Sequence, residues 1–478
     1  MDSQISVRSI PATMAGLMLC LFLSALDNSI VGTAMPKIIA DLQGLRHYSL
    51  PFTSYLLFST VVIPIAGKLS DVFGRKIVAL WGIGFFMLTS ALCGLSVNMP
   101  MLVLFRGLQG ACAGVLASSA FIICAELFPP QVRGKYIGML VSMHGLASLL
   151  GPVAGGLITD YFSWHWIFYL NIPVGLLSFL LLKKQLPLIK HPGSSNEIDF
   201  NGIALFLLAL FPLLFCFTEG GKLLPWSSPI TISLIIFSGL MLVGFIKVER
   251  YSKSPLLPVE MLKNKVFRRA SFSAAMGYVA LFGLILYVPF LLQIVQHKGA
   301  AYSGMVMLPM SLAIVVGGMS GGFIASKWMR FKLQAMVNFS ISIVGLIPLL
   351  VYGEGISMGM LIFGILLVGL GIGLNFPTMN MAPQAFFPAA QMGILISSLE
   401  FFQIMGGVVS TSVLGGLLHV STQWLIALCI VAMALGFIAM AGLNEKEIRD
   451  KFAARYKKPA VDGECAAVHN HQKERSFS

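Results

Sequence analysis

Fourteen apolar stretches recur along the whole chain, and each is long enough to cross about 30 Å of hydrocarbon as an α-helix. Only 11% of the 478 residues are charged, whereas soluble domains average roughly 25%. The chain is therefore predicted to be an all-α, polytopic membrane protein. The predicted spans are 11–35, 48–68, 77–97, 101–124, 136–158, 165–182, 202–218, 229–248, 270–294, 302–325, 335–353, 357–378, 391–415 and 422–442.

The lysines and arginines predict the orientation of these helices. An even number of spans puts both termini on one side of the membrane, and positive charge gathers in cytoplasmic loops. With cytoplasmic termini, all but five of the 32 lysines and arginines fall in cytoplasmic segments; the exceptions are Lys37, Arg46, Arg106, Lys222 and Lys298. The net charge of +13 thus indicates topology rather than nucleic-acid binding. We expect a multi-pass protein of a cell membrane, with short loops that suggest a bacterial inner membrane.

Two long polar connections, 183–201 and 247–269, bracket one pair of helices and leave six helices on either side. The predicted organisation is an N-terminal six-helix bundle in 1–182, a linker with two extra helices in 183–269, a C-terminal six-helix bundle in 270–443 and a cytoplasmic tail in 444–478. The loop sequences "GKLSDVFGRK" and "GFIASKWMRF" follow equivalent helices of the two bundles and echo each other. This similarity indicates a duplicated unit, which is common in secondary transporters.

The stretch "AGKLSDVFGRKIVAL" (66–80) carries the strongest local signal. Gly67 and Gly74 allow a tight turn between two helices, while Asp71 and Arg75 put both signs of charge at the membrane surface. The stretch resembles the cytoplasmic signature between helices 2 and 3 of the major facilitator superfamily. The resemblance implies that these four residues form a conformational gate.

Three further stretches resemble the fourteen-helix drug:proton antiporter branch of that family, in the expected order: "LDNSIVGTAMP" (26–36), "FRGLQGACAG" (105–114) and "LASLLGPVAGGLITDYFSWHWIFYLNIPVG" (146–175). The resemblance implies two six-helix bundles plus two inserted helices, and export in exchange for protons. Three departures stand out: His165 replaces an arginine, Gly32 replaces an asparagine, and only one Gly-Pro pair is present.

The third stretch contains the antiporter motif of helix 5, in which glycines permit close helix packing and a proline removes a backbone hydrogen bond and bends the helix. Its residues are Gly151, Pro152, Gly155 and Gly156.

Asp27 and Arg106 lie at compatible depths in helices 1 and 4. A charge inside the hydrocarbon costs about 2.5–3.5 kcal/mol on insertion scales, so such residues usually face the interior and pair. We expect the two to face each other. A carboxylate in that position can exchange a proton as a cavity opens and closes; the alternative is a fixed structural ion pair.

Glu400 is the second deeply placed carboxylate, with no basic residue at similar depth in neighbouring segments. It could bind a proton, a cationic substrate or both, or be a neutral group hydrogen-bonded to a neighbouring helix. His144 is a candidate proton relay or a structural polar group. With His144, three amides are candidate cavity-lining residues: Gln109, Asn375 and Gln403.

The predicted function is proton-coupled export of a small amphipathic or cationic compound by alternating access. An alternative keeps the fold but moves a specific metabolite, such as a siderophore or a lysolipid. An integral membrane enzyme is a distant alternative, because the 8 histidines and 19 acidic residues are scattered without catalytic spacing. No phosphate-binding loop is present, so we expect no direct drive by ATP, no cofactor and no metal. The expected partners are the substrate, protons and the lipid bilayer; periplasmic or outer-membrane export partners are left open.

Overall fold

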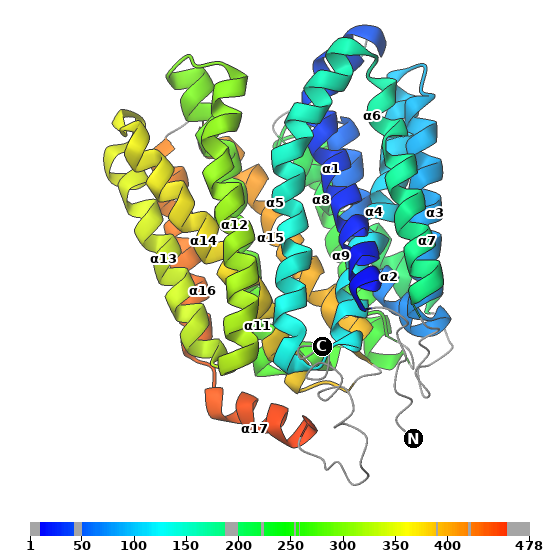
Figure 1. The fold of residues 1–478 in the computed structure, drawn as a ribbon, viewed down its shortest axis with the longest axis vertical. Coiled ribbons are helices and arrows are strands. Elements are labelled where there is room, and N and C mark those ends of the chain that lie inside the picture. The colour runs from blue at the N-terminus through cyan, green and yellow to red at the C-terminus, as the bar shows by residue number, and fades with distance from the viewer. Residues whose placement is uncertain are drawn as a thin grey trace, which may run out of the picture.

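The structure, a computed structural model, describes residues 10–42, 50–186, 199–220, 224–252, 255–257, 259–388, 391–418 and 422–456. In these ranges, thirteen helices are long and apolar enough to cross a membrane, and the two straight parts of a bent helix make a fourteenth. The all-α, fourteen-helix prediction is confirmed. Figure 1 shows the helices standing roughly parallel to one another.

The helices match the predicted spans and extend several of them. The spanning helices are α1 (Ile10–Leu42), α2 (Leu50–Phe73), α3 (Arg75–Gly94), α4 (Met99–Leu127), α5 (Pro130–Tyr161), α6 (His165–Tyr169) with α7 (Asn171–Gln185), α8 (Phe200–Glu219), α9 (Pro229–Tyr251), α11 (Lys265–Pro289) with the π-helical η2 (Phe290–Val295), α12 (Ala300–Trp328), α13 (Phe331–Tyr352), α14 (Met358–Met381), α15 (Met392–Leu418) and α16 (Thr422–Ala441). Shorter elements are α10 (Val259–Lys263), η3 (Gly353–Gly355), η4 (Ala382–Ala385) and α17 (Glu445–Tyr456).

Because the spans alternate in direction, α1 begins and α16 ends at the same membrane face, at the bottom of Figure 1. We call it the terminal face and the other the opposite face. Turns between helices carry local signals. Gly74 has φ = 97° between α2 and α3, a conformation that glycine adopts without strain. Asn98 caps α4 by accepting a hydrogen bond from the Met101 N–H at 2.9 Å.

Two groups of helices lie side by side in Figure 1, with α1, α3, α4 and α7 in one and α13, α14 and α16 in the other. Two helix pairs join them: α5 packs along α12, and α2 packs along α15. We call these contacts the α5–α12 seam and the α2–α15 seam. Glycines permit close packing within a group as well, since a Cβ on Gly317 of α12 would lie 2.6 Å from the Leu370 carbonyl oxygen of α14.

The helices α8 and α9, which follow the first predicted long connection, pack against each other and cover the α2–α15 seam. α8 contacts both α2 and α15. The ring of Phe206 lies 5.5 Å from that of Phe401 on α15, and the ring of Phe211 lies 5.0 Å from that of Phe58 on α2. One apolar cluster therefore joins this pair to both groups of helices.

The predicted tail begins with a helix that lies at the terminal face, below α13 and α16 in Figure 1. Ile448 and Phe452 of α17 are buried, and the Phe452 ring stacks on Phe331 at 5.6 Å between centroids. The apolar side of α17 is thus anchored on the second group of helices. The rest of the predicted tail lies outside the described residues.

Candidate functional site

Asp27 lies in α1, about two-thirds of the way along the membrane-spanning part Ile10–Met35, as the sequence predicts, and its side chain is only 1% exposed. The helix itself is longer than this span and continues through Lys37 and Asp41 to Leu42.

The Asp27 carboxylate accepts hydrogen bonds from three residues on two other helices. Its Oδ2 pairs with Arg106 Nη1 of α4, which confirms the predicted contact. Its Oδ1 accepts from Gln109 Nε2 of α4 at 2.9 Å and from Asn171 Nδ2 of α7 at 2.6 Å. Charge-assisted hydrogen bonds of this kind are the strong ones. One buried carboxylate therefore ties α1, α4 and α7 together.

Arg106 is fully buried, and its guanidinium carbon lies 4.1 Å from the centroid of the Tyr55 ring of α2. Its Nη1 also donates to Gln109 Oε1 at 2.9 Å, while Nε and Nη2 make no hydrogen bond to a described residue. The Tyr55 hydroxyl donates to the Ser24 carbonyl at 3.0 Å. A cation over an aromatic face gains about 2 kcal/mol when desolvated. Arg106 is thus held by the Asp27 charge on one side and by a ring on the other.

Asn171 and Tyr55 are site residues that sequence reasoning missed. Asn171 also donates to Ser90 Oγ at 2.9 Å, and Ser90 donates to the Phe168 carbonyl at 2.8 Å. The signal in the sequence was a single amide in the apolar run "IFYLNIPVG". Gln109, which we expected to line a substrate cavity, belongs instead to the Asp27 cluster and is fully buried.

The gate residues Asp71 and Arg75 lie beside the turn between α2 and α3, at the terminal face, and both side chains are buried there. Arg75 pairs with Asp71 at 2.5 Å and with Glu126 of α4 at 2.6 Å, and its Nε donates to Glu126 Oε1 at 2.8 Å. Sequence reasoning missed Glu126. The reason for burial is α15, since a Cβ on Gly393 would lie 2.7 Å from Arg75 Nη1. The charges lie under the end of a helix from the other group.

Gly67 is a point of close approach and not part of a turn, which corrects the prediction. It lies inside α2, and a Cβ there would be 2.7 Å from Ser397 Cβ and 2.8 Å from the Gly393 carbonyl oxygen of α15. Only Gly74 forms the predicted turn. The two glycines therefore have different roles in one motif.

The α5–α12 seam is equally tight at the terminal face. A Cβ on Gly134 would lie 2.7 Å from the Gly322 carbonyl carbon, and the Gly134 N–H donates to Ser326 Oγ at 2.8 Å. Arg133 Nη1 donates to Gln384 Oε1 in η4 of the second group. These contacts, like those of Gly67 and Gly393, lie in the half of the membrane next to the terminal face. The two groups of helices are thus in close contact there.

Within the antiporter motif, Gly151 and Gly155 contact α1, and Gly156 does not make a close contact. A Cβ on Gly155 would lie 2.9 Å from the Ile30 carbonyl oxygen, whereas a Cβ on Gly156 would meet nothing within 4 Å. The helix bends by about 40° between Val132–Ser148 and Val153–Thr159, the position at which Pro152 is expected to bend it. The bent helix contacts α12 below the bend and α1 above it.

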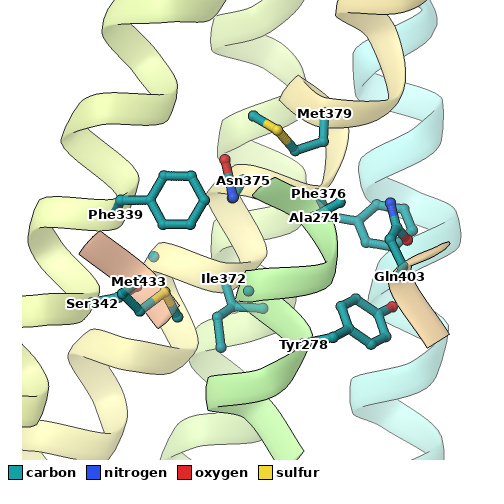
Figure 2. Close-up of a pocket in the computed structure, with 12 residues that line it drawn as sticks. Ala274, Tyr278, Phe339, Ser342, Ile372, Asn375, Phe376, Met379, Gln403 and Met433 are labelled. Carbon is teal, nitrogen blue, oxygen red and sulfur yellow. The ribbon is translucent and has the colours of Figure 1, made fainter. Parts of the chain in front are cut away.

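Glu400, Asn375 and Gln403 lie in the second group, apart from the Asp27 cluster, and all three are buried. Asn375 and Gln403 line one small cavity with Tyr278 and Phe376 (Figure 2). Glu400 makes no ion pair with a described residue, and its buried Oε2 has no hydrogen-bond partner there. The predicted coupling residues are thus in two places, with Asp27 and Arg106 in one and Glu400 in the other.

His144 and His165 are both separate from these clusters. His144 of α5 is exposed, and no hydrogen bond of its side chain is described. The His165 ring stacks on Trp164 at 3.7 Å and its Nδ1 lies 2.7 Å from Ser163 Oγ, while Trp164 Nε1 donates to Asp41 at 2.8 Å. His165 therefore packs at the opposite-face end of α1.

Among the described residues, no three His, Cys, Asp or Glu side chains are grouped closely enough to hold a metal ion. The charged groups instead form the Asp27–Arg106 and Asp71–Arg75–Glu126 clusters.

Known proteins resemble the chain in sequence and in fold. Multidrug transporter protein MdtP of Bacillus subtilis is 36% identical over 85% of this chain and 75% of its own length. Multidrug resistance protein 3 of the same organism is 33% identical over 84% of this chain and 78% of its own. The crystal structure of the human organic anion transporter MFSD10 superposes with a TM-score of 0.69 at 16% identity, covering 90% of this chain and 99% of that one.

A second solved structure, the proton:xylose symporter XylE, has a TM-score of 0.65 at 13% identity and covers 91% of this chain and 94% of its own. At these identities the two structures show the fold alone. The sequence profile of the Major Facilitator Superfamily matches residues 17–411. A family of transporters with this fold leaves no place for the alternative of a membrane enzyme, and the chain belongs to the Major Facilitator Superfamily.

Proposed function

We propose that the protein exports small amphipathic or cationic compounds in exchange for protons, by alternating access. The observation that carries the proposal is the single carboxylate of Asp27, buried within a membrane-spanning helix and bound by Arg106, Gln109 and Asn171. Two relatives with more than 30% identity have names that state multidrug transport or resistance. Export of chemically varied compounds fits these relatives.

Protonation of Asp27 changes the forces inside the cluster. An ionised Asp27 balances the buried charge of Arg106, and breaking a buried pair by removing one partner costs about 3–5 kcal/mol. When Asp27 takes up a proton, Arg106 loses its counter-charge, and its contacts with α1 weaken. Because the cluster joins α1, α4 and α7, protonation favours a different arrangement of these helices. This is how one proton can bias a conformational equilibrium.

The α5–α12 and α2–α15 seams are the contacts along which the two groups of helices can move against each other. We assign residues 1–182 and 270–443 to two units that rock against each other, 183–269 to the inserted pair, and 444–478 to the tail. The terminal face is assigned to the cytoplasm, on the positive-inside pattern, in a bacterial inner membrane. The close contacts at Gly67, Gly134 and Arg133 then correspond to a closed cytoplasmic gate.

A second candidate keeps this mechanism and changes the cargo to a specific metabolite, such as a siderophore or a lysolipid. Glu400 favours it, because a buried carboxylate without an ion-pair partner among the described residues is suited to one particular ligand. His165 also favours it, because the antiporter motif that the sequence resembles has an arginine at this position.

Inverted membrane vesicles test the proposal. The interior is acidified, a quenched dye reports the pH gradient, and lipophilic cations, neutral drugs and metal-chelating metabolites are added in turn. We expect at least one compound to dissipate the gradient with the wild-type protein and not with Asp27→Asn. Asp41→Asn is the matched control, since Asp41 lies on the same helix and accepts from Trp164. A compound that crosses equally fast with and without the gradient contradicts proton coupling.

A further inference from the structure

A groove on the outer surface of the second group of helices has a volume of about 480 Å³. One face of α13 forms most of its wall, and Leu333, Val337 and Val344 on that face are about half exposed. Leu367 of α14 and Phe437 of α16 contribute to the rest of the lining. We call it the α13 groove. A groove of this size with an almost wholly apolar lining accepts an apolar ligand.

The α13 groove has the length of one membrane leaflet. α13 begins at Phe331 at the terminal face, and the groove runs along it from Leu333 to Val344. At 1.5 Å per residue, this stretch of helix is about 16 Å long. The hydrocarbon of a bilayer is about 30 Å thick, so each leaflet fills about 15 Å of it. The groove therefore matches the acyl chain of a lipid in the leaflet next to the terminal face.

Two basic residues stand at the terminal-face end of the α13 groove. Arg330, at the N-cap position of α13, is exposed, and Lys332 is partly exposed. Residues three or four apart share a helix face, so Arg330 is in line with Leu333. In the same way, Lys332 is in line with Met336, which also lines the groove. Because Cα–Cβ bonds tilt towards the N-terminus of a helix, here the terminal face, both long side chains are directed to the level of the lipid head groups.

The helices that line the groove add no opposing charge, since α13, α14 and α16 contain no acidic residue. On the α16 side of the same end, Arg269 Nη1 donates a hydrogen bond to the Gly442 carbonyl, just after the helix. α17, which carries charges of both signs, docks on the buried ring of Phe331, about 200° around α13 from the exposed Leu333. The end of the groove is therefore open, with basic residues on both sides.

An apolar groove with basic residues at one end fits a phospholipid, whose acyl chains are joined to a phosphate. Arginine binds phosphate through two parallel N–H donors, and lysine binds it as a point charge. A choline or ethanolamine head group brings its own cation beside the phosphate, whereas a glycerol head group leaves the phosphate charge uncompensated. The basic residues therefore favour an anionic lipid over a zwitterionic lipid with the same chains.

We propose that the α13 groove binds one anionic phospholipid of the leaflet next to the terminal face. An acyl chain lies along α13, and the phosphate lies at Arg330 and Lys332. The proposal does not rest on the transport function, because the groove belongs to the outer surface of the second group of helices and the Asp27 cluster to the first group.

Native mass spectrometry of the purified full-length protein in detergent tests the proposal, because it counts bound lipids and measures their affinity. The probes are phosphatidylglycerol and phosphatidylcholine with identical palmitoyl and oleoyl chains. We expect one phosphatidylglycerol to bind at least about tenfold more tightly than phosphatidylcholine, since each basic residue near an anionic lipid contributes roughly fivefold. Equal affinities for the two lipids overturn the proposal, because the groove then holds lipid only as a solvent.

Removal of charge tests the phosphate contact. The double variant Arg330→Gln with Lys332→Gln is expected to bring the affinities for the two lipids within about twofold. The double variant Lys183→Gln with Lys184→Gln is the matched control, since both lysines are exposed at the terminal-face end of α7. If the control loses the preference to the same extent, the preference comes from the overall charge of this face and not from the groove.

Filling of the groove tests the acyl-chain contact. Val337→Trp, at a half-exposed position, is expected to weaken phosphatidylglycerol binding about fivefold or more, because it occupies the apolar surface that the chain would cover. Val351→Trp is the matched control, since Val351 is 64% exposed on the same helix and lies beyond the groove.

Two further outcomes contradict the assignment. If the preference for phosphatidylglycerol persists both in Val337→Trp and in the Arg330 and Lys332 double variant, the lipid binds elsewhere. If soluble glycerol phosphate, at the same concentration as the lipid, displaces phosphatidylglycerol, the basic residues form a site for free phosphate and the groove does not hold the chain.

Discussion

Gly134 of α5 and Gly322 of α12 approach so closely that a Cβ on Gly134 would lie 2.7 Å from the carbonyl carbon of Gly322. Gly67 of α2 makes the same kind of contact with α15. Gly67 and Gly322 begin the two loop sequences that echo each other in the two halves of the chain. The weak repeat in the sequence thus marks the glycine at which each half contacts the other.

A methyl group at this seam is expected to hold it open. Gly134→Ala places a Cβ against backbone that has no flexible side chain to move aside, so the closed arrangement at the terminal face is disfavoured. We expect transport to fall about tenfold or more, since a shift of 1.4 kcal/mol in a conformational equilibrium is a factor of ten. Uptake of a fluorescent cation into inverted vesicles measures it.

Gly156→Ala is the control for the seam, because it lies on the same helix and its Cβ would meet nothing within 4 Å. It is expected to transport like the wild type. If both variants transport normally, close contact at Gly134 is not required for the cycle.

The buried gate cluster is expected to stabilise the fold. Glu126→Ala removes the partner of Arg75 Nε and Nη2 and leaves a buried guanidinium with Asp71 as its remaining carboxylate. The free energy of unfolding should fall by about 3 kcal/mol or more. Thermal unfolding in detergent, followed by tryptophan fluorescence, measures the loss. Lys76→Gln changes a partly exposed charge beside Arg75 and is expected to leave the unfolding temperature almost unchanged.

Asn171 is expected to position the Asp27 carboxylate. Asn171→Leu keeps a similar volume but removes the donor to Asp27 Oδ1 and to Ser90. A hydrogen bond to a charged group contributes about 1.5–3 kcal/mol, so substrate-driven proton flux should fall about tenfold or more. Ser90→Ala removes only the second contact and is expected to have a smaller effect. An equal loss of proton flux in the two variants would show that the hydrogen bond from Asn171 to Asp27 is not required for coupling.

The inserted helices are expected to stabilise the α2–α15 seam through Phe206. This ring is buried against Phe401 of α15 and Phe245 of α9. Phe206→Ala should lower the free energy of unfolding by about 3–5 kcal/mol, through lost burial and the cavity that remains. Leu208→Ala, at an exposed position of the same helix, is the control, and thermal unfolding compares the two. If they unfold alike, α8 does not hold the seam.

The depth of each polar residue in the membrane was predictable from the sequence. The direction in which its side chain points around the helix axis was not. The apolar runs gave the fourteen spans, and the matching depths of Asp27 and Arg106 gave their contact. The same reasoning placed Asp71 and Arg75 at the membrane surface, but no local pattern shows that Gly393 of a distant helix covers them.

The sequence also does not show which helices are neighbours in the fold. Asn171 and Glu126 each lie in an apolar run, and their partners are far away in sequence. Gln109 was expected to line a substrate cavity, because a polar side chain within the membrane usually faces the interior of the helix bundle. In the structure it does face the interior, where it donates a hydrogen bond to Asp27. Only the packing of α1, α4 and α7 shows whether such an amide lines a substrate cavity or binds a neighbouring carboxylate.

The most direct test of the account is proton movement driven by substrate alone. Purified protein is reconstituted into liposomes that enclose a pH-sensitive dye, at equal pH on both sides, and ethidium is loaded on one side only. Antiport predicts that protons move against the ethidium flux, that Asp27→Asn abolishes this movement, and that Asp41→Asn retains it. Ethidium flux at the wild-type rate in Asp27→Asn, with no pH change in either protein, would contradict proton coupling and leave the Asp27–Arg106 pair a structural contact.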